Sequence, residues 1–468
     1  MTAPRLNLDS QAIWSPRVQA PPRYSRSHAP GVVHLGLGAF HRAHQAMVFD
    51  RLLASGDPRW GVHGVGMTQA SLVDALRAQD GLYAVRVADA QGSHWEVPGA
   101  IFQMNVAATE REAVVRAIAA PATRWVSLTV TEKGYTPALA QLLLDGLRRR
   151  WQNHLSGLTI ASCDNLQASG RKLQALLMAQ PADTVLHDWI DAHCAFPCSM
   201  VDRIVPATSD AVRDAVVRDL GVQDPTALSV ETFWEWVIED RFADPADAAL
   251  LAAQGVRVTP EVHVYEDAKL RMLNGSHSAM ALIGAVTGRA CIADCIGEPH
   301  IRAFVHGLMG QEVAPHLARR DWKDYSDALI ARFGNPHLRH SVHQIATDSS
   351  LKIPLRWVPS IEAQLACGGG VEHHALAAAL WLRHGLARDE HGQSYTLHDP
   401  QAAWLLDNAA TQADDPGRSL QAFLARTDFW GGTLPHHEGW RARVAQWHQS
   451  VLALGTDRAI EQLIRTLP

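Results

Sequence analysis

The chain has 468 residues, of which 47% are hydrophobic and 19% charged, with a formal net charge of −6. This length allows two or more domains with sizeable cores. The acidic balance offers no basic surface for nucleic acid or a membrane, and no apolar run reaches the roughly 18 residues of a membrane span. Six cysteines and an N-terminus without an apolar leader predict a reduced, cytoplasmic protein.

Residues 1–30 are rich in proline and arginine, and we expect them to run over the surface as an arm. Short apolar runs then alternate with helical patterns, which is typical of a parallel, doubly wound sheet. The expected strands cover residues 32–37, 60–66, 82–87, 125–131 and 158–162. The expected helices run from the first glycine turn to about residue 54, from about residue 71, and over residues 136–151.

After about residue 258 a helical period dominates to the C-terminus. Interruptions are expected at Pro315, Pro336, Pro354, Gly368–Gly370 and Pro435. We therefore predict an α/β fold in two domains. A Rossmann-like, doubly wound dinucleotide-binding domain covers residues 1–258, and a mainly α-helical substrate and catalytic domain covers residues 259–468.

The first expected strand breaks into Gly36-Leu-Gly38-Ala-Phe40-His41 before a helix. Such glycines let the backbone approach a pyrophosphate, and the helix N-terminus supplies N–H donors. The motif is incomplete, because His41 holds the place of the third glycine. Met67-Thr68-Gln69 stands where an acidic residue would bond the ribose. By itself the motif leaves open both a dinucleotide site and a tight turn without a ligand.

Two residue pairs could suggest a metal ion, His41 with His44 and Cys194 with Cys198. Neither pair is accompanied by the further ligands that a zinc site requires. The sequence therefore predicts no metal site.

A concentration of polar groups in residues 265–278 precedes an apolar stretch, Ala279–Val286, which predicts a buried helix. On one α-helix, at about 100° per residue from Lys269, Glu266 lies at about 60°, His277 at about 80° and Asn274 at about 140°. A buried lysine is costly unless it is paired or neutral, so the cluster marks a candidate site near the domain junction. The alternative is an internal Glu266–Lys269 ion pair with hydrogen-bonded core neighbours.

Several segments stand in a specific order along residues 32–356. They are Gly36-Leu-Gly-Ala-Phe-His-Arg-Ala-His-Gln45, Thr131-Glu-Lys-Gly-Tyr135, Ser162-Cys-Asp-Asn165-Leu166, residues 196–206, residues 236–240, the spacing of Lys269, Asn274 and His277, the pair Asn335-Pro336, and the spacing of Asp348, Lys352 and Pro354. Together they resemble the mannitol dehydrogenase family of polyol-specific long-chain dehydrogenases. The resemblance implies a two-domain fold, an NAD(P)-dependent and metal-independent reaction, and substrates that are sugar alcohols or sugar acids.

The resemblance also implies roles for particular residues. Lys269 would be the general base, Asn274 and Asn165 the donors to the developing alkoxide, and His277 the partner of a neighbouring hydroxyl, while Glu266 would gate proton exchange. These roles agree with the needs of alcohol oxidation without a metal. The implied substrate-binding residues are Asp202, Gln344 and Lys352, and the implied cofactor-binding residues are Gly36, Gly38, Phe40, His41, Glu132 and Lys133. For Asp202 the alternative is a structural pair with Arg203.

The segment Gln344–Arg356 bears on the substrate. Mannitol 2-dehydrogenases tend to carry Arg at the place of Gln344 and His at that of Thr347, whereas fructuronate reductases and several bacterial polyol dehydrogenases carry QIAMDGSQKLPQR. The chain is closer to the second pattern and departs from both at Thr347, Ser349, Leu351, Ile353 and Leu355. A sugar acid would need a cation, for which Lys352, Arg356 and Arg339 are candidates.

We interpret the chain as an enzyme that interconverts a polyol and a ketose with NAD, with NADP as the alternative cofactor. The rival interpretations are a hexuronate reductase of the fructuronate type and a non-catalytic dinucleotide sensor. The expected partner is a small sugar alcohol, ketose or sugar acid, with no nucleic acid or membrane, and the expected state is a monomer or weak oligomer.

Overall fold

A parallel sheet organises the first half of the chain in this computed structural model, which describes residues 3–15, 18, 23–181, 184–337 and 340–466. Its strands are β1 (Val32–Leu35), β2 (Val62–Gly66), β5 (Ile101–Val106), β6 (Trp125–Leu128) and β7 (Thr159–Ser162). They lie in the order β5-β2-β1-β6-β7, and each pairing is parallel. The chain order reverses between β1 and β6, and sheets of this kind bind ligands beside the carboxyl ends of the strands at that point.

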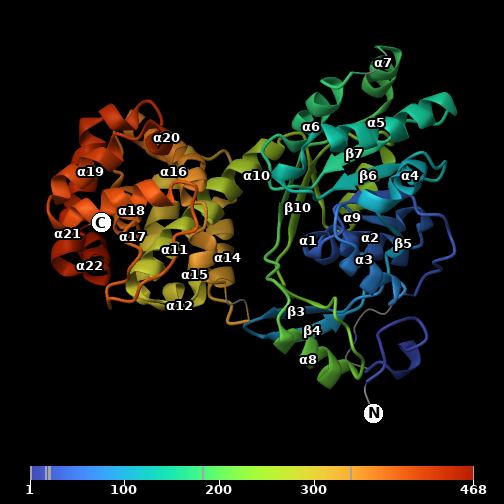
Figure 1. Cartoon of the computed structure of the whole chain (residues 1–468), viewed down its shortest axis with the longest axis horizontal. Helices are drawn as coiled ribbons and strands as arrows, with labels where there is room; N and C mark the ends of the chain where they lie inside the picture. The colour runs from blue at the N-terminus through green and yellow to red at the C-terminus, as the bar shows by residue number, and fades with distance from the viewer. Residues whose placement is uncertain (1–2, 16–17, 19–22, 182–183, 338–339, 467–468) are drawn as a thin grey trace. The chain divides into compact units, whose positions relative to one another are not determined.

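Helices cover both faces of this sheet (Figure 1). They are α1 (Ala39–Ala43), α2 (Gln45–Ala54), α3 (Ala70–Arg77), α4 (Ala107–Ile118), α5 (Pro137–Gln152), α6 (Ser169–Met178) and α7 (Thr184–His193). Successive side chains of β1 point to opposite faces: Val32 packs in the core with α2, whereas Val33 and Leu35 pack with α4 and α5. Burial on both faces explains why β1 and β6 read as largely apolar runs without strict alternation.

Two smaller sheets complete this part of the chain. One has the order β4-β3-β9, with β3 (Val85–Asp89), β4 (Gly92–Glu96) and β9 (Leu228–Glu231), and the other the order β11-β10-β8, with β8 (Ser199–Asp202), β10 (Glu235–Glu239) and β11 (Arg257–Thr259). Helices α8 (Asp210–Leu220) and α9 (Ala246–Ala253) accompany them. The expectation that residues 82–87 form the third strand of the parallel alternation is wrong, because β3 pairs with β4 and β9 instead.

The third strand of the parallel sheet along the chain is β5, which the sequence pattern did not reveal. It is an edge strand, and its exposed Gln103 and half-buried Asn105 dilute the apolar signal. Arginines bond two of its carbonyls: Arg26 donates to Ile101 O, and Arg77 donates to Met104 O at 3.0 Å. Such bonds satisfy an edge that could otherwise pair with another strand.

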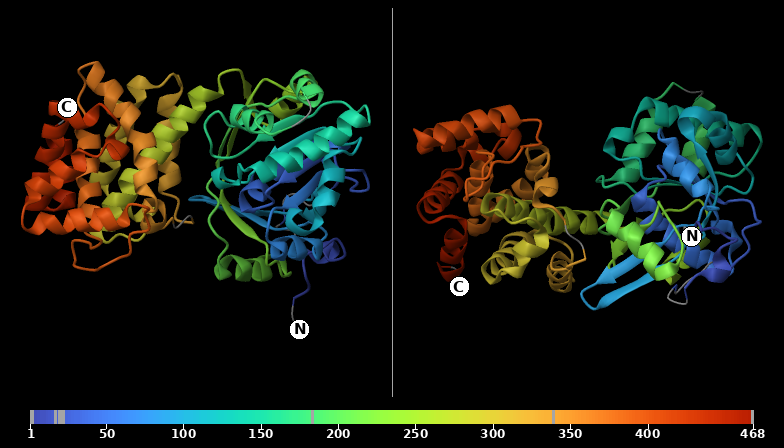
Figure 2. Two further views of the ribbon diagram at one scale, coloured as in Figure 1. Left: turned by 45° about the horizontal axis from the view of Figure 1, so that its top comes forward. Right: turned by 60° about the horizontal axis from the view of Figure 1, so that its bottom comes forward.

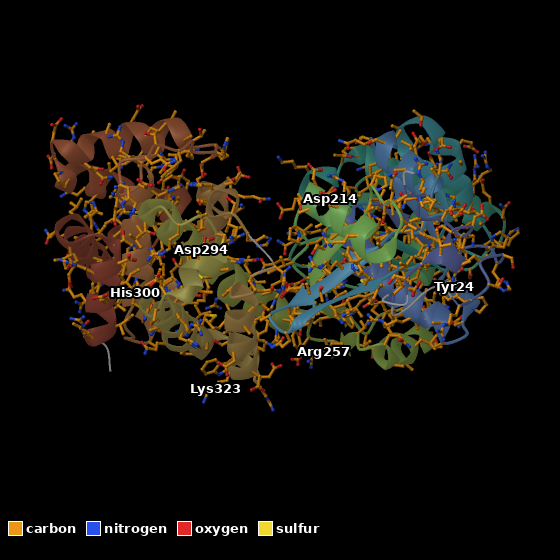
Figure 3. The ribbon with its side chains drawn as sticks, turned by 90° about the horizontal axis from the view of Figure 1, so that it is seen from below. Tyr24, Asp214, Arg257, Asp294, His300 and Lys323 are labelled. Atoms are coloured by element: carbon orange, nitrogen blue, oxygen red, sulfur yellow. The ribbon has the colours of Figure 1, made fainter. Side chains whose placement is uncertain are left out.

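The N-terminal arm is partly built into the core. Leu6 is fully buried in a cluster with α8, and its N–H donates to Gln223 O at 2.9 Å. Further along, the hydroxyl of Tyr24, labelled in Figure 3, donates to Asp50 on α2. Burial raises the pKa of Asp50 to about 6, although the bonds from Tyr24 and the Gly99 N–H oppose this effect. The arm is thus attached to the core at two places.

From residue 262 onward the described residues contain helices and no strand. They are α10 (Val262–Ala268), the π-helical segment η4 (Lys269–Asn274), α11 (Gly275–Thr287), α12 (Ile292–Gly297), α13 (Pro299–Gly307), a second π-helical segment η5 (Leu308–Val313), α14 (Trp322–Phe333), α15 (Val342–Ala346), α16 (Ser349–Ala366), α17 (Glu372–His384), α18 (Ala402–Ala410), α19 (Pro416–Leu424), α20 (Thr427–Trp430), α21 (Glu438–Leu454) and α22 (Thr456–Thr466). By its contacts the chain divides into two compact units, Met1–His263 and Val264–Pro468.

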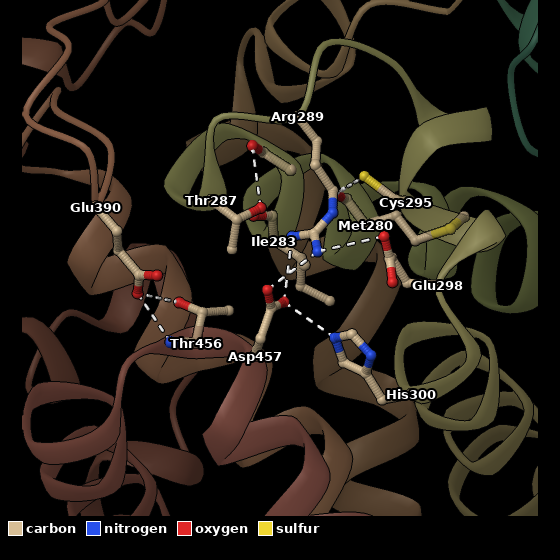
Figure 4. Close-up of polar contacts among 11 residues, drawn as sticks. Met280, Ile283, Thr287, Arg289, Cys295, Glu298, His300, Glu390, Thr456 and Asp457 are labelled. Carbon is tan, nitrogen blue, oxygen red and sulfur yellow. Dashed lines mark hydrogen bonds and ion pairs between the residues drawn. The ribbon is translucent and has the colours of Figure 1, made fainter.

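Helix α11 forms the centre of the second unit (Figure 2). Twelve of its thirteen residues are buried, and it packs against α12, α15, α16 and α17. Beyond its C-terminus Arg289 donates to both carboxylate oxygens of Asp457 on α22, at 3.1 and 3.0 Å, and His300 lies 3.0 Å from the same carboxylate (Figure 4). None of the helices in the described part of the chain is long and apolar enough to cross a membrane.

The expected break at Pro354 is wrong, because α16 runs through both Pro354 and Pro359. A proline inside a helix removes a backbone hydrogen bond and costs about 3 kcal/mol. Tertiary contacts offset this cost. Asp399 accepts from the N–H of Ser350 in the first turn at 2.8 Å, and the Trp357 side chain is fully buried. Pro315, Pro336, Gly368–Gly370 and Pro435 do lie between α-helices.

A buried carboxylate joins two helical segments of this unit. Glu312 on η5 accepts from the backbone N–H groups of His373 and His374 at 2.7 and 3.0 Å. It also contacts Nδ1 of both imidazoles, at 2.9 and 2.6 Å. Burial alone would raise the pKa of Glu312, but the bonds to the two histidines outweigh it and hold the pKa at about 2. Glu312 therefore acts as an anionic cap for the first turn of α17.

We expect Glu312→Gln to lower the free energy of unfolding by about 3 kcal/mol, because it removes a buried charge from its partners. Urea unfolding followed by tryptophan fluorescence measures the effect. Because the pKa of Glu312 is depressed, its contribution is complete above about pH 4.3 and is lost toward pH 2, so the two proteins should converge on acidification. Glu298→Gln, whose side chain is 47% exposed, is the control and should change stability by less than about 0.5 kcal/mol. Equal losses in both variants would contradict the assignment.

Candidate functional site

The glycine turn after β1 lies at the carboxyl edge of the sheet, beside the reversal of strand order. Gly36 has a φ of +96°, and a Cβ there would stand 2.1 Å from Thr129 O. The hydroxyl of Thr129 donates to Gly36 O at 2.9 Å, which ties the turn to the end of β6. At Gly38, in contrast, the nearest atom to an added Cβ would be Gly36 O at 3.5 Å. Gly36 is thus required by the fold, whereas Gly38 leaves open space at the start of α1.

Two stacked histidines support this turn from the protein interior. The rings of His34 and His41 are 3.3 Å apart and nearly parallel. Burial lowers the pKa of His34 to about 3, and burial together with His34 and Arg42 holds the pKa of His41 well below its ordinary value. Both rings are therefore neutral at pH 7. His41 is fully buried, whereas Phe40 is partly exposed and stacks on His44 at 5.0 Å.

The loop after β6 has an unusual backbone. Thr131 is a β-branched residue with a φ of +64°, a conformation that persists only where the surroundings enforce it. Asp164, at the end of β7, accepts from the Thr131 N–H at 2.7 Å and from the Tyr135 hydroxyl at 3.0 Å. Burial raises the pKa of Asp164, although its hydrogen bonds oppose the shift. This carboxyl group therefore fixes the loop that carries Glu132 and Lys133.

Glu132, Lys133 and Asn165 are all exposed at this same edge of the sheet. The first two lie on a short 3₁₀ turn, Glu132–Gly134, and Asn165 follows Asp164 directly. The supporting roles of Asp164 and Tyr135 were not inferred from the sequence. The available signal was a carboxylate next to Asn165 and a tyrosine closing the loop, two residues whose contact is long-range.

The loop after β2 carries no carboxylate, since Met67, Thr68 and Gln69 form it, and the last two are exposed. Asp202 lies elsewhere in the first unit, at the end of β8, and is 3% exposed. The guanidinium of its neighbour Arg203 donates to the backbone oxygens of Ala43 and Glu231, at 2.6 and 2.8 Å. Arg203 thus connects α1 to β9.

In the second unit Glu266, Lys269, Asn274 and His277 lie on one continuous helical run, α10–η4–α11. The run is not a uniform α-helix, because Lys269–Asn274 is π-helical and the Gly275 N–H reaches Leu270 O, five residues back. A π turn contains more residues than an α turn, so the angle between Lys269 and Asn274 is smaller than an α-helix predicts. The helix after the cluster is buried as expected, while the four polar residues themselves are half-buried.

The ring of His277 lies beside two aromatic neighbours. Its centroid lies 4.7 Å from that of Phe333 at the end of α14 and 5.8 Å from that of His340. Burial, with a further effect of Arg332, lowers the pKa of His340. His340 could not be inferred from the sequence, because its contact with His277 joins positions 63 residues apart.

Lys352 and Arg356 on α16 donate hydrogen bonds to main-chain oxygens. The ammonium of Lys352 donates to Thr347 O at 2.5 Å and to Ile345 O at 3.4 Å. Burial and the nearby Arg356 lower the pKa of Lys352. Arg356 donates to Asn274 O at 3.1 Å. Gln344 is exposed on α15, which packs on α11, and Arg339 lies outside the described residues.

Two further features bear on metal and anion binding. Among the described residues no group of three or more His, Cys, Asp or Glu side chains is arranged to hold a metal ion. A recess of about 700 Å³ opens at the amino-terminal edge of the parallel sheet and includes Arg59 and Arg124. Both arginines are paired with acids, Arg59 with Asp57 and Arg124 with Asp247. The recess therefore offers no free cluster of cations.

Comparison with known proteins gives matches along nearly the whole chain. Residues 30–248 match the mannitol dehydrogenase Rossmann domain, and residues 261–452 match the mannitol dehydrogenase C-terminal domain. D-mannonate oxidoreductase of Escherichia coli K12 is 36% identical over 468 residues, covering 92% of this chain and 95% of the relative. Mannitol 2-dehydrogenase of Phaeosphaeria nodorum is 36% identical over 440 residues, covering 86% and 77%.

A solved structure gives a similar result. The Pseudomonas fluorescens mannitol 2-dehydrogenase ternary complex with NAD and D-mannitol matches with a TM-score of 0.85 and 30% identity. The match covers 99% of this chain and 100% of that one. The relatives therefore include enzymes named for a polyol and an enzyme named for a sugar acid.

Two glycine substitutions should separate folding from ligand binding at the turn. Gly36→Ala introduces both a strained φ and a collision with Thr129 O, so we expect a loss of stability on the order of 3 kcal/mol. Gly38→Ala should leave the melting temperature nearly unchanged but weaken dinucleotide binding about tenfold or more, because its Cβ enters the space beside the N-terminus of α1. Calorimetry and NADH fluorescence titration measure the two effects. Unchanged NADH affinity in a folded Gly38→Ala protein would refute a cofactor site here.

Proposed function

Since the chain belongs to the mannitol dehydrogenase family of oxidoreductases, we propose that it interconverts a sugar alcohol and its ketose with NAD, using Lys269 as general base and no metal ion. The single observation that carries this proposal is the helical run in which Lys269, Asn274 and His277 are set by a π turn at the start of a buried helix. The six cysteines are all free thiols, which supports a reducing, cytoplasmic location.

Features of the first unit support the proposed dinucleotide site. Gly36 allows the close turn, Gly38 leaves space, and both lie where the strand order of the parallel sheet reverses. We propose that the turn, with Phe40 and the Glu132–Lys133 loop, holds the cofactor, and that His41 supports it from below. Without a carboxylate after β2 the selection against a 2′-phosphate is weak, and without an arginine in Met67–Gln69 NAD is favoured. When bound, the nicotinamide supplies the hydride acceptor for oxidation.

The second unit supplies the proton chemistry in this proposal. Neutral Lys269 removes the proton of the reacting hydroxyl, and Glu266 passes that proton onward to water. The side-chain amides of Asn274 and Asn165 donate to the oxygen as it gains charge, an effect worth several kcal/mol. His277, which lies beside Phe333 and His340, orients a neighbouring hydroxyl. Asp202 and Gln344 are proposed to contact the remaining hydroxyls.

The choice of a neutral polyol over a sugar acid rests on the described cations of α16. A carboxylate needs a cation that is free to pair with it. Lys352 and Arg356 already donate to Thr347 O and Asn274 O, respectively, so pairing with a substrate would compete with these bonds. The second candidate is a hexuronate reductase, which the 36% identity to D-mannonate oxidoreductase favours. A dinucleotide sensor would not need the lysine.

Lys269→Ala should lower kcat by several orders of magnitude, because the reaction loses its base, while the affinity for NADH stays nearly unchanged. Added methylamine should restore part of the activity by replacing the missing amine. Lys323→Ala, at an exposed position of the same unit, is the control and should retain full kcat. A Lys269→Ala enzyme with more than about a tenth of the wild-type rate would overturn the assignment.

A substrate panel decides between the two candidate reactions. We expect hexitols, pentitols and their ketoses to be turned over with a kcat/KM higher than that for fructuronate, because the two described candidate cations, Lys352 and Arg356, already donate to main-chain oxygens. Initial rates with NAD(H) and NADP(H) measure both the substrate and the cofactor preference. A preference for fructuronate above about a hundredfold, roughly 2.7 kcal/mol in transition-state binding, would establish the hexuronate reductase instead.

A further inference from the structure

Three side chains of α16 contact the π turn that begins at Lys269 and ends at Asn274. Arg356 donates through Nη1 to Asn274 O at 3.1 Å and to the Ser278 hydroxyl at 2.7 Å. Trp357 donates through Nε1 to Gly275 O at 3.0 Å. The hydroxyl of Ser360 accepts from Nε of Arg271, inside the turn, at 2.8 Å. Positions 356, 357 and 360 share one face of a helix, so a single face of α16 contacts the turn at Arg271 and Asn274 and the next residue, Gly275.

A π turn needs such support. It is rare, it interrupts the regular α-helical ladder, and it is retained mainly where the surroundings enforce it. The second unit supplies this enforcement from several elements. Arg271 also donates to His316 O at 3.2 Å, and Trp357 is fully buried with its ring against His374. Trp357, which bonds the end of the π turn, therefore also contacts His374, a partner of the buried Glu312.

Among these contacts, that of Arg356 bears most directly on the proposed catalytic residues, because Arg356 bonds the backbone oxygen of Asn274. Burial lowers the pKa of Arg356 to about 10, so the guanidinium remains charged at neutral pH. Hydrogen bonds from a charged donor are roughly twice as strong as neutral ones. The same cation bonds Ser278, one helical turn further along α11, and therefore fixes the direction in which the helix leaves the π turn.

We propose that Arg356 is a positioning residue that acts through Asn274: it holds the backbone of Asn274, and so the side-chain amide and the Lys269 end of the turn, in the geometry for catalysis. The inference rests on the proposed function, in which Asn274 stabilises the developing alkoxide. It differs from a role in substrate binding, in which Arg356 would pair directly with a carboxylate.

A double-mutant cycle tests the inference on the full-length enzyme. Arg356→Met should lower kcat about 10- to 100-fold, the scale of a misplaced catalytic group, with KM changed less than about threefold. Arg356→Lys should restore a large part of kcat. In an Asn274→Ala background the same Arg356→Met change should cost less than about threefold, because the group that it positions is already gone.

Two further variants serve as a control and as a second test of the same contact region. Arg289→Met, at the other end of α11, removes the Asp457 pair and should lower the melting temperature while leaving kcat within about twofold. Trp357→Phe keeps the buried ring and loses only the N–H bond to Gly275 O. It should lower kcat by a smaller factor than Arg356→Met, and it serves if the latter does not fold.

The outcomes separate cleanly. An equal loss of kcat from Arg356→Met with and without Asn274 would overturn the positioning role, as would a change confined to KM for sugar acids, which would assign Arg356 to the substrate. Full kcat in Asn274→Ala alone would instead overturn the proposed function of Asn274, independently of any result at Arg356.

Discussion

The hydrogen bonds between one face of α16 and the π turn at Lys269–Asn274 are the constraint on which the second unit depends. A helix that changes its pitch cannot present its side chains at regular angles, so their directions are set by whatever holds the change in place. Here the holding groups are Arg356, Trp357 and Ser360. Nearly all of α11 is buried, and a closely packed helix cannot rotate about its axis. The π turn before α11 therefore cannot relax to a regular α-helix.

The first unit uses the same strategy at another place. The carboxyl edge of its parallel sheet combines a turn at Gly36 that only glycine can adopt with a threonine at positive φ, Thr131, which no local preference favours. Asp164 maintains Thr131 from the next strand, as Arg356 maintains Asn274 from the next helix. In both units a backbone irregularity carries the candidate functional residues, and a polar side chain from a neighbouring element keeps it in place.

The elements that could be predicted from sequence are those specified locally. The strands at residues 60–66, 125–131 and 158–162, the helix over residues 136–151 and the helical second half follow from apolar runs and period, and the structure confirms them. Pairing partners are not local, which is why residues 82–87 were assigned to the wrong sheet and the polar edge strand β5 was missed. Pro354 is tolerated because tertiary contacts outweigh a local preference. The π turn could not be predicted, because side-chain angles inferred from the sequence assume the 100° per residue of a regular α-helix.

The sequence motifs predicted part of the arrangement of the candidate site residues. Motifs placed Gly36, Glu132 and Asn165 after successive strands, and parallel pairing brings them to one edge. The supporting residues Asp164, His340 and Arg356 act across long sequence separations, so neither spacing nor composition reveals their partners. Their positions become apparent only from the hydrogen bonds and ring contacts of the folded chain.

Several buried or half-buried arginines of the described chain donate to main-chain oxygens. Four of them are Arg42, Arg150, Arg203 and Arg356. Burial lowers the pKa of Arg150, Arg203 and Arg356 to about 10, so each stays charged at neutral pH. A guanidinium that donates to backbone carbonyls keeps its positive charge, but it has fewer N–H donors left to bond a ligand. At Arg356 a substrate carboxylate would have to displace bonds that hold the π turn, whereas a hydroxyl could add to them. This use of a buried cation is one support for the proposed recognition of a neutral sugar by hydrogen bonds.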